Sequence, residues 1–265
     1  MKKNLSFVIT ILLLFVLFVG CAPSSGVQDP EGGSKKDVSD ADIVEQQVAA
    51  FLPEITVAEE NRVLPPSRIG TEGTLSAIWH WESLEAAYAQ ADLVAVVQIQ
   101  NWLGEKDTGF PGTYFDAVVV KDYKAKATGP IVLLQDGASS HTHKGYPLFS
   151  YGNAIFVFLK KTDAAPYENA YYILNPAMNL ADVVEPSPGE VYFVERGEVF
   201  QKEYKSLENY GTDKNLSKAV LNSLRLNDSL RYPSDLEHPI GQFYKESDVE
   251  ELLKSLAKKQ GGTSK

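Results

Sequence analysis

Two histidines on either side of a threonine are the first residues of this sequence that could do metal chemistry. His141 and His143 flank Thr142, and imidazole is a ligand for zinc, copper, nickel and iron. On a strand, residues two positions apart face the same side, so the pair would present two ligands together. The residues that follow, KGYPL, offer no acid as a third ligand, and turn residues surround the pair. We therefore expect a solvated loop, with no metal and no cofactor.

The residues just before this pair could contribute to a hydrolase. Ser139 and Ser140 precede His141, and Asp136 is close by, which are the residue types of a serine-nucleophile triad. A triad is an arrangement in space, however, and the sequence contains no G-x-S-x-G elbow. An enzyme whose active site is assembled only in the fold therefore stays open as an alternative.

A tryptophan pair is the candidate for ligand binding. Trp79 and Trp81 flank His80 and could form an exposed aromatic platform for a sugar or a peptide. The same run could instead pack one ring against the core before a helix. Both interpretations remain open.

Cys21, the only cysteine, lies in the stretch FVLFVGCAPSSG at residues 15–26. A cationic start, Met1-Lys2-Lys3, and a run from Leu5 to Val19 that is apolar except for Ser6 and Thr10 come before it. This is the layout of a secretory signal peptide, and the run is short for a spanning helix, which needs about 20 apolar residues.

Gly20 followed by Cys21 resembles the lipobox of bacterial lipoproteins, although Phe18 stands where that family usually has leucine. The resemblance implies cleavage before Cys21 and a diacylglycerol thioether on its sulfur. A free thiol in an uncleaved anchor, or cleavage further along the chain, are the alternatives. Because no second thiol exists, an internal disulfide is excluded and the domain must be held by its own core.

The charge balance of the chain argues against some classes of binding partner. Removing residues 1–20 takes away Lys2 and Lys3, which leaves 23 basic against 35 acidic side chains and a formal charge of −12. Nucleic-acid binding needs a basic face, so we expect no nucleic-acid partner. Anionic lipid would not attract this surface either, and the lipid anchor itself would hold the protein at the membrane.

The chain divides into a leader, a tether and one globular domain. We expect a signal peptide at 1–20, a lipidated flexible tether at 21–40 and a domain at 41–265, with a β-rich core at about 82–203 and C-terminal helices at about 214–259. The tether is rich in Ser, Gly, Pro and charge, and its 19 residues after Cys21 would reach about 25 Å.

Short apolar runs between turn residues predict a series of strands. They cover residues 92–102, 113–125, 129–137, 154–159, 171–176 and 191–201, the last as a hairpin that turns at Arg196-Gly197. A helix is predicted after the N-cap Ser83, another over 41–52, and two more in the tail. The last of these begins with a capping box, Ser247 and Glu250.

Short loops without intervening helices favour an antiparallel sheet, so the predicted fold is α+β, mainly antiparallel β, with six to seven strands in a small barrel or sandwich and flanking helices. ADLVAVVQI, GPIVLLQDG and GYPLFSYGNAIFVFLKK resemble segments of uncharacterised bacterial secreted and lipoprotein domains with OB-like or netrin-like barrels. This resemblance covers about residues 82–200, rests on packing motifs and carries over no functional residues.

These observations together predict an extracytoplasmic lipoprotein, anchored in the cell membrane by its lipid, that acts by binding. The partner would be an envelope protein or a cell-wall ligand. A cell-envelope hydrolase is the alternative, and a purely structural spacer or accessory subunit is a third.

Overall fold

The computed structural model describes residues 49–54, 57–75, 83–106, 109–126, 129–143, 146–163, 166–175, 180–195, 207–226 and 242–262. By its contacts the chain divides into two units, Met1–Glu45 and Gln46–Lys265. Cys21, Trp79 and Trp81 lie outside the described residues, so the roles expected for them stay predictions. Of the helix predicted over 41–52, only residues 49–52 are described, and these are not helical.

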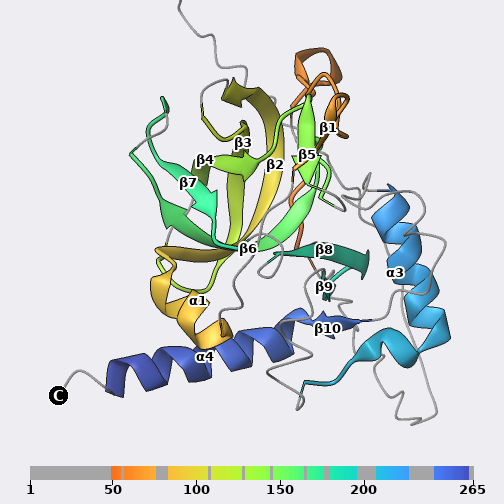
Figure 1. The fold of residues 1–265 in the computed structure, drawn as a ribbon. Helices are drawn as coiled ribbons and strands as arrows, with labels where there is room; N and C mark the ends of the chain where they lie inside the picture. The colour runs from red at the N-terminus through yellow and green to blue at the C-terminus, as the bar shows by residue number, and fades with distance from the viewer. Residues whose placement is uncertain are drawn as a thin grey trace, which may run out of the picture. The chain divides into compact units, whose positions relative to one another are not determined.

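Five strands close into a barrel (Figure 1). They are β2 (Leu93–Lys106), β3 (Gly112–Asp122), β4 (Gly129–Asp136), β6 (Ala154–Lys161) and β7 (Ala170–Ile173). They pair in the order β6-β2-β3-β4-β7, and β7 pairs back to β6. Every pair is antiparallel except β4–β7, which is parallel. The predicted fold class, α+β with an OB-like barrel, is confirmed, and the barrel rather than the sandwich is the form that it takes.

The barrel interior follows from alternation along the strands. Inward residues of every strand form one buried cluster, which includes Leu93, Ile99, Phe115, Leu133 and Val157. The neighbours that point outward are more polar or only half-buried on β3 and β4. The fourteen-residue strand β2 has three register irregularities against β3. Such bulges bend a strand, which lets β2 pair with β6 over its first half and with β3 over nearly all its length.

Three further strands extend the sheet beyond β6. They are β8 (Leu180–Ser187), β9 (Glu190–Glu195) and β10 (Phe243–Lys245), in the order β6-β8-β9-β10. Helices α1 (Leu84–Gln90) and α4 (Glu246–Gly262) share one buried cluster with β8, β9 and the outer side of β2 and β6. Helix α3 (Lys214–Leu226) packs through Val220 and Leu224 against the opposite face of β8, β9 and β10.

The hairpin predicted at 191–201 pairs the residues of β9 with the wrong strand. Val191–Glu195 does form part of β9, but its partner is the preceding β8, and the turn between them contains Gly189 with φ of 78°. β8 is absent from the predicted strands, and it contains Pro186, which has no amide hydrogen to donate within a sheet. The structure accommodates this proline where the β8–β9 register shifts between Val184 and Ser187. Residues 196–200, which include the predicted turn, lie outside the described residues.

Of the two predicted helix N-termini, the first is confirmed and the second is wrong. Ser83 caps α1, since its hydroxyl accepts from the Ala86 amide at 3.0 Å. The capping box predicted for α4 is wrong because the helix begins one residue earlier, at Glu246, directly after β10. Ser247 is therefore inside the helix, and its hydroxyl donates to Asp248.

A separate pair of strands, β1 (Gly73–Leu75) and β5 (His141–His143), runs parallel beside the barrel. A short 3-10 helix, η1 (Glu59–Asn61), precedes β1, and another, η2 (Tyr210–Thr212), precedes α3. None of the helices in the described part of the chain has the length and apolar character of a membrane span.

Candidate functional site

The histidine pair is not in a solvated loop. His141 and His143 lie on β5, and His143 is only 5% exposed, so the sequence-based expectation is wrong for this residue. Its ring stacks on Phe110, with 5.9 Å between ring centroids. Burial lowers the pKa of His143, while Asp136 opposes the shift; burial also raises the pKa of Asp136. β5 pairs with β1 in register, and this pairing places both histidines on a packed strand.

The described residues contain no group of three or more His, Cys, Asp or Glu side chains that could hold a metal ion. His141 lies over Gly73, where an added Cβ would come within 3.3 Å of its ring. The two imidazoles are therefore engaged in packing with β1 and the β2–β3 connection. That the protein needs no metal stays a prediction.

Ser139 and Ser140 form the two-residue turn between Ala138 and His141, whose backbones exchange two hydrogen bonds of 2.8 and 3.0 Å. The Ser139 hydroxyl donates to Glu105 at 3.0 Å, and its amide donates to the same carboxylate at 2.9 Å. A catalytic serine would direct its proton to a histidine. The geometry gives Ser139 a turn-stabilising role.

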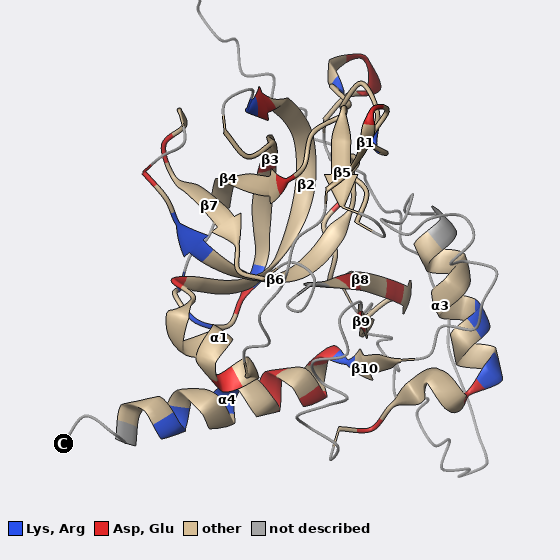
Figure 2. Cartoon of the chain, viewed as in Figure 1, with Lys and Arg blue, Asp and Glu red and all other residues tan. Residues whose placement is uncertain are grey.

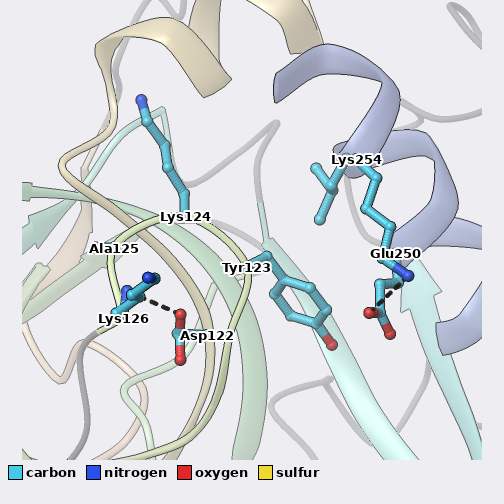
Figure 3. Close-up of a pocket in the computed structure, with 8 residues that line it drawn as sticks. Asp122, Tyr123, Lys124, Ala125, Lys126, Glu250 and Lys254 are labelled. Carbon is cyan, nitrogen blue, oxygen red and sulfur yellow. Dashed lines mark hydrogen bonds and ion pairs between the residues drawn. The ribbon is translucent and has the colours of Figure 1, made fainter. Parts of the chain in front are cut away.

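A cavity of about 570 Å³ opens between α4 and the turn after β3 (Figure 3). Its lining is mostly charged: Asp122, Lys124, Lys126, Glu250 and Lys254, together with Tyr123, Ala125 and Leu253. Several of these groups already have partners within the fold. Lys254 pairs with Glu250 at 3.1 Å, and Asp122 accepts from the Lys126 amide at 2.9 Å.

Lys124 turns away from this cavity toward α1 (Figure 3). Its ammonium donates to the carbonyls of Tyr88, Ala89 and Ala91, where the helix ends. A cation at the C-terminal end of a helix also interacts favourably with the helix dipole. Lys124 therefore ties the turn after β3 to α1.

Beside the cavity a charged latch holds α4 on the barrel. Lys121 of β3 donates to Glu246 at 2.7 Å and to Glu250 at 2.6 Å, and the Tyr123 hydroxyl donates to Glu246 at 2.6 Å. Burial by itself would lower the pKa of Lys121, but the two carboxylates raise it on balance. Burial and then Glu246 raise the pKa of Tyr123. We call Lys121, Tyr123, Glu246 and Glu250 the α4 latch; its groups bind each other, which indicates a structural role.

Replacing Glu246 by glutamine should lower the free energy of unfolding by about 1–3 kcal/mol, because two half-buried donors lose their shared anionic acceptor. Denaturant unfolding of the mature chain measures this. Glu251→Gln is the matched control on the same helix. The Glu251 side chain is 75% exposed and pairs only across the surface with Lys254, so its loss should cost at most about 1 kcal/mol. Equal losses in the two variants would contradict a latch.

The α4 latch should also weaken in acid. Lys121 donates to Glu250 and lowers the pKa of that carboxyl from its ordinary value of 4.5. A carboxyl with a lowered folded-state pKa stabilises the fold above the unfolded value and loses this contribution as the pH falls through the folded value. The loss of stability below about pH 4.5 should thus be smaller in a Lys121→Met variant.

A second feature lies on the outer side of the barrel. Tyr114, Leu134 and Tyr172 are register partners on β3, β4 and β7, and they form one row across the sheet. Tyr167, from the β6–β7 connection, places its ring edge-on against Tyr114 with 5.2 Å between centroids. We call Tyr114, Leu134, Tyr167 and Tyr172 the tyrosine face.

The tyrosine face is fixed by a contact between the β6–β7 connection and strand β2. The Tyr167 hydroxyl donates to the Leu103 carbonyl, near the end of β2, at 3.2 Å. Gly104 is the β2 partner of Tyr114, and a Cβ added there would meet nothing within 4 Å. The space beside Gly104 is therefore open, while Tyr114 itself is only 5% exposed. Leu103, which is 37% exposed, lies next to this opening. Tyr172, which is 38% exposed, lies at the other end of the row.

A cavity of about 610 Å³ lies in the β6–β7 connection itself. Its lining is polar apart from one proline and one ring: Lys161, Thr162, Asp163, Pro166, Tyr167, Glu168 and Asn169. Asn169 fixes the end of the connection, since its side-chain amide donates to the Pro130 carbonyl at 2.9 Å and its own carbonyl accepts from Val132. Tyr167 thus belongs both to this cavity and to the tyrosine face.

Asp116 is an acidic residue on the same outer side of the barrel. It lies on β3, between its register partners Asn101 of β2 and Val132 of β4. Burial raises the pKa of Asp116, with partial opposition from a backbone hydrogen bond. Burial, and then Tyr167, raise the pKa of Tyr114.

Comparison with protein-family models, with curated proteins and with solved structures finds no match to this chain. The functional argument thus depends on the geometry described above and on the leader sequence.

The tyrosine face is the site that sequence reasoning missed. Thirteen tyrosines are too many to select from, and strand alternation alone does not distinguish Tyr114 from the others. One signal was present: Tyr167 lies in a turn-rich connection between two predicted strands, where a large ring has no core to join.

Proposed function

We propose that this protein is a lipid-anchored extracytoplasmic lipoprotein whose barrel binds its ligand through the tyrosine face. The leader and the Gly20-Cys21 junction support the anchor, as the sequence analysis derives. The single observation that favours binding at this face is the contact of Tyr167 with Leu103 and Tyr114, which holds an aromatic ring at an open part of the barrel surface.

The position of the first described residues supports this arrangement. Glu185 of β8 accepts from the amides of Phe51 and Leu52 at 2.8 and 3.0 Å, which holds these two residues against β8. The Lys121 ammonium lies 5.9 Å from the Phe51 ring, which places this point near the α4 latch. Lys121 and Tyr114 are seven residues apart on β3, about 20 Å along the strand. A ligand on the tyrosine face would therefore lie away from Phe51 and Leu52.

The barrel topology supports the same choice of surface. Small OB-like barrels bind ligands on one sheet face and the connections beside it. In this barrel Tyr167 of the β6–β7 connection lies against Tyr114 of β3 and Leu103 of β2. The acidic balance of the chain disfavours nucleic acid as the ligand.

Tyr167→Ala should weaken ligand binding about tenfold or more, because an aromatic anchor is lost from the centre of the site. The assay holds the mature chain in liposomes through its lipid and measures retention of fractionated envelope polymers and peptides. Tyr210→Ala, at η2, is the control on another part of the domain, and thermal unfolding confirms that each variant is folded.

Unchanged retention by a folded Tyr167→Ala variant would contradict binding at this face. Turnover of an ester, peptide, glycoside or phosphate substrate that one point substitution abolishes would instead support the hydrolase alternative.

A further inference from the structure

The cavity beside Tyr167 has a lining with the groups that hold a polyhydroxylated molecule. Asp163, Glu168 and Asn169 carry side-chain oxygens that can accept from hydroxyls, while Lys161 and Thr162 can donate. Tyr167 adds an aromatic ring at the margin of the same cavity. Its volume, about 610 Å³, is within the usual range for ligand pockets.

The charge of the cavity lining distinguishes between classes of ligand. The lining contains one lysine against two carboxylates, so the opposite charges largely offset each other. Nearby, Lys160 is already paired with Asp92 at 2.8 Å. Figure 2 shows acidic and basic residues together on the β6–β7 hairpin rather than a field of one sign. An anionic polymer needs a basic groove, and a cationic peptide would be favoured by a more acidic one.

We propose that the tyrosine face and the adjoining cavity bind a neutral oligosaccharide chain; this inference rests on the proposed function and specifies its ligand. Sugar rings present an apolar face that packs on an aromatic ring, and their hydroxyls both donate and accept. Tyr172, which is 38% exposed, and the half-buried Leu134 and Tyr167 give the packing surface, with the buried Tyr114 behind them. The cavity gives the polar partners.

Tyr167 is the residue that joins these two parts. Its hydroxyl bond to the Leu103 carbonyl and its edge contact with Tyr114 fix the ring before any ligand arrives. A fixed ring loses less conformational entropy on binding than a mobile one. The chain of sugars would run from the cavity across the open surface at Gly104, where nothing obstructs it within 4 Å of a Cβ position.

The test uses the full mature chain in detergent micelles and an array of neutral oligosaccharides, with oligolysine and polyphosphate as charged probes. We expect binding to at least one neutral glycan, with an affinity that changes less than about twofold from low to high salt, because no ion pairs are formed. Tyr167→Ala should weaken this binding about tenfold or more. Asp163→Asn and Glu168→Gln should each weaken it about three- to tenfold. Glu251→Gln is the remote control.

Each alternative result has a distinct meaning. Salt-sensitive binding of oligolysine that depends on Tyr167, without glycan binding, would overturn the glycan inference and leave the binding face standing. Polyphosphate binding of the same kind would overturn it equally. If no probe binds in a Tyr167-dependent manner, and the liposome assay retains nothing either, both the glycan inference and the proposed function fail.

Discussion

Cys21→Ala will lose fatty-acid label and will no longer be retained in the membrane fraction. Each buried methylene of an acyl chain contributes about 0.8 kcal/mol, and two chains suffice for stable attachment where one is marginal. The charge of −12 left after removal of residues 1–20 gives the domain no electrostatic attraction to anionic lipid in their place. Metabolic labelling followed by membrane fractionation measures both effects.

Ser24→Ala is the matched control for this experiment, since it changes a nearby residue of the same stretch and keeps the cysteine. It should keep label and membrane retention at the level of the original chain. Undiminished label on the Cys21→Ala protein would refute lipidation at this residue. Loss of label with unchanged retention would indicate an uncleaved apolar anchor.

Phe156→Ala should lower the free energy of unfolding by about 3–5 kcal/mol, the usual cost of emptying a buried aromatic position. Phe156 on β6 is 0% exposed. Its ring stacks on Phe193 at 4.7 Å and meets the edges of Phe158 and Tyr123 at 5.3 and 5.7 Å. It therefore joins the outer side of the barrel to β9 and to the α4 latch. Calorimetry or denaturant unfolding measures the loss.

Phe110→Ala is the same substitution at a ring that is 48% exposed, in the β2–β3 connection. It loses only a stacking contact with His143, so the cost should stay below about 1.5 kcal/mol. Similar losses in the two variants would show that the aromatic cluster of Phe156, Phe158 and Phe193 on β6 and β9 is not the centre of the core.

Charge along α4 shows how local sequence and tertiary contact combine. Acidic residues occupy the first half of the helix and lysines the second half (Figure 2). This order of charges interacts favourably with the helix dipole and can be read from the sequence. The start of the helix was not readable, because Glu246 is positioned by Lys121 and Tyr123, which are more than 120 residues away.

The sequence alone determined the elements with strong local patterns. Ser83 caps α1, the alternating or apolar runs form β2, β3, β4, β6 and β7, and the apolar stripes of the tail form α3 and α4. These follow from periodicity and capping, which depend on neighbours along the chain. The leader and Cys21 are also local signals, and they led to the expected anchor.

Only the tertiary structure decided how these elements meet. The barrel closes through the parallel β4–β7 pair, and Tyr167 from the β6–β7 connection lies against Tyr114 and Leu103. His143 is buried by another long-range pairing, that of β5 with β1. Leu103 and Tyr167 are 64 positions apart. Such contacts reflect which surfaces fit once the core has formed, and single-residue preferences do not encode them. The surface proposed for binding is therefore a property of the closed barrel.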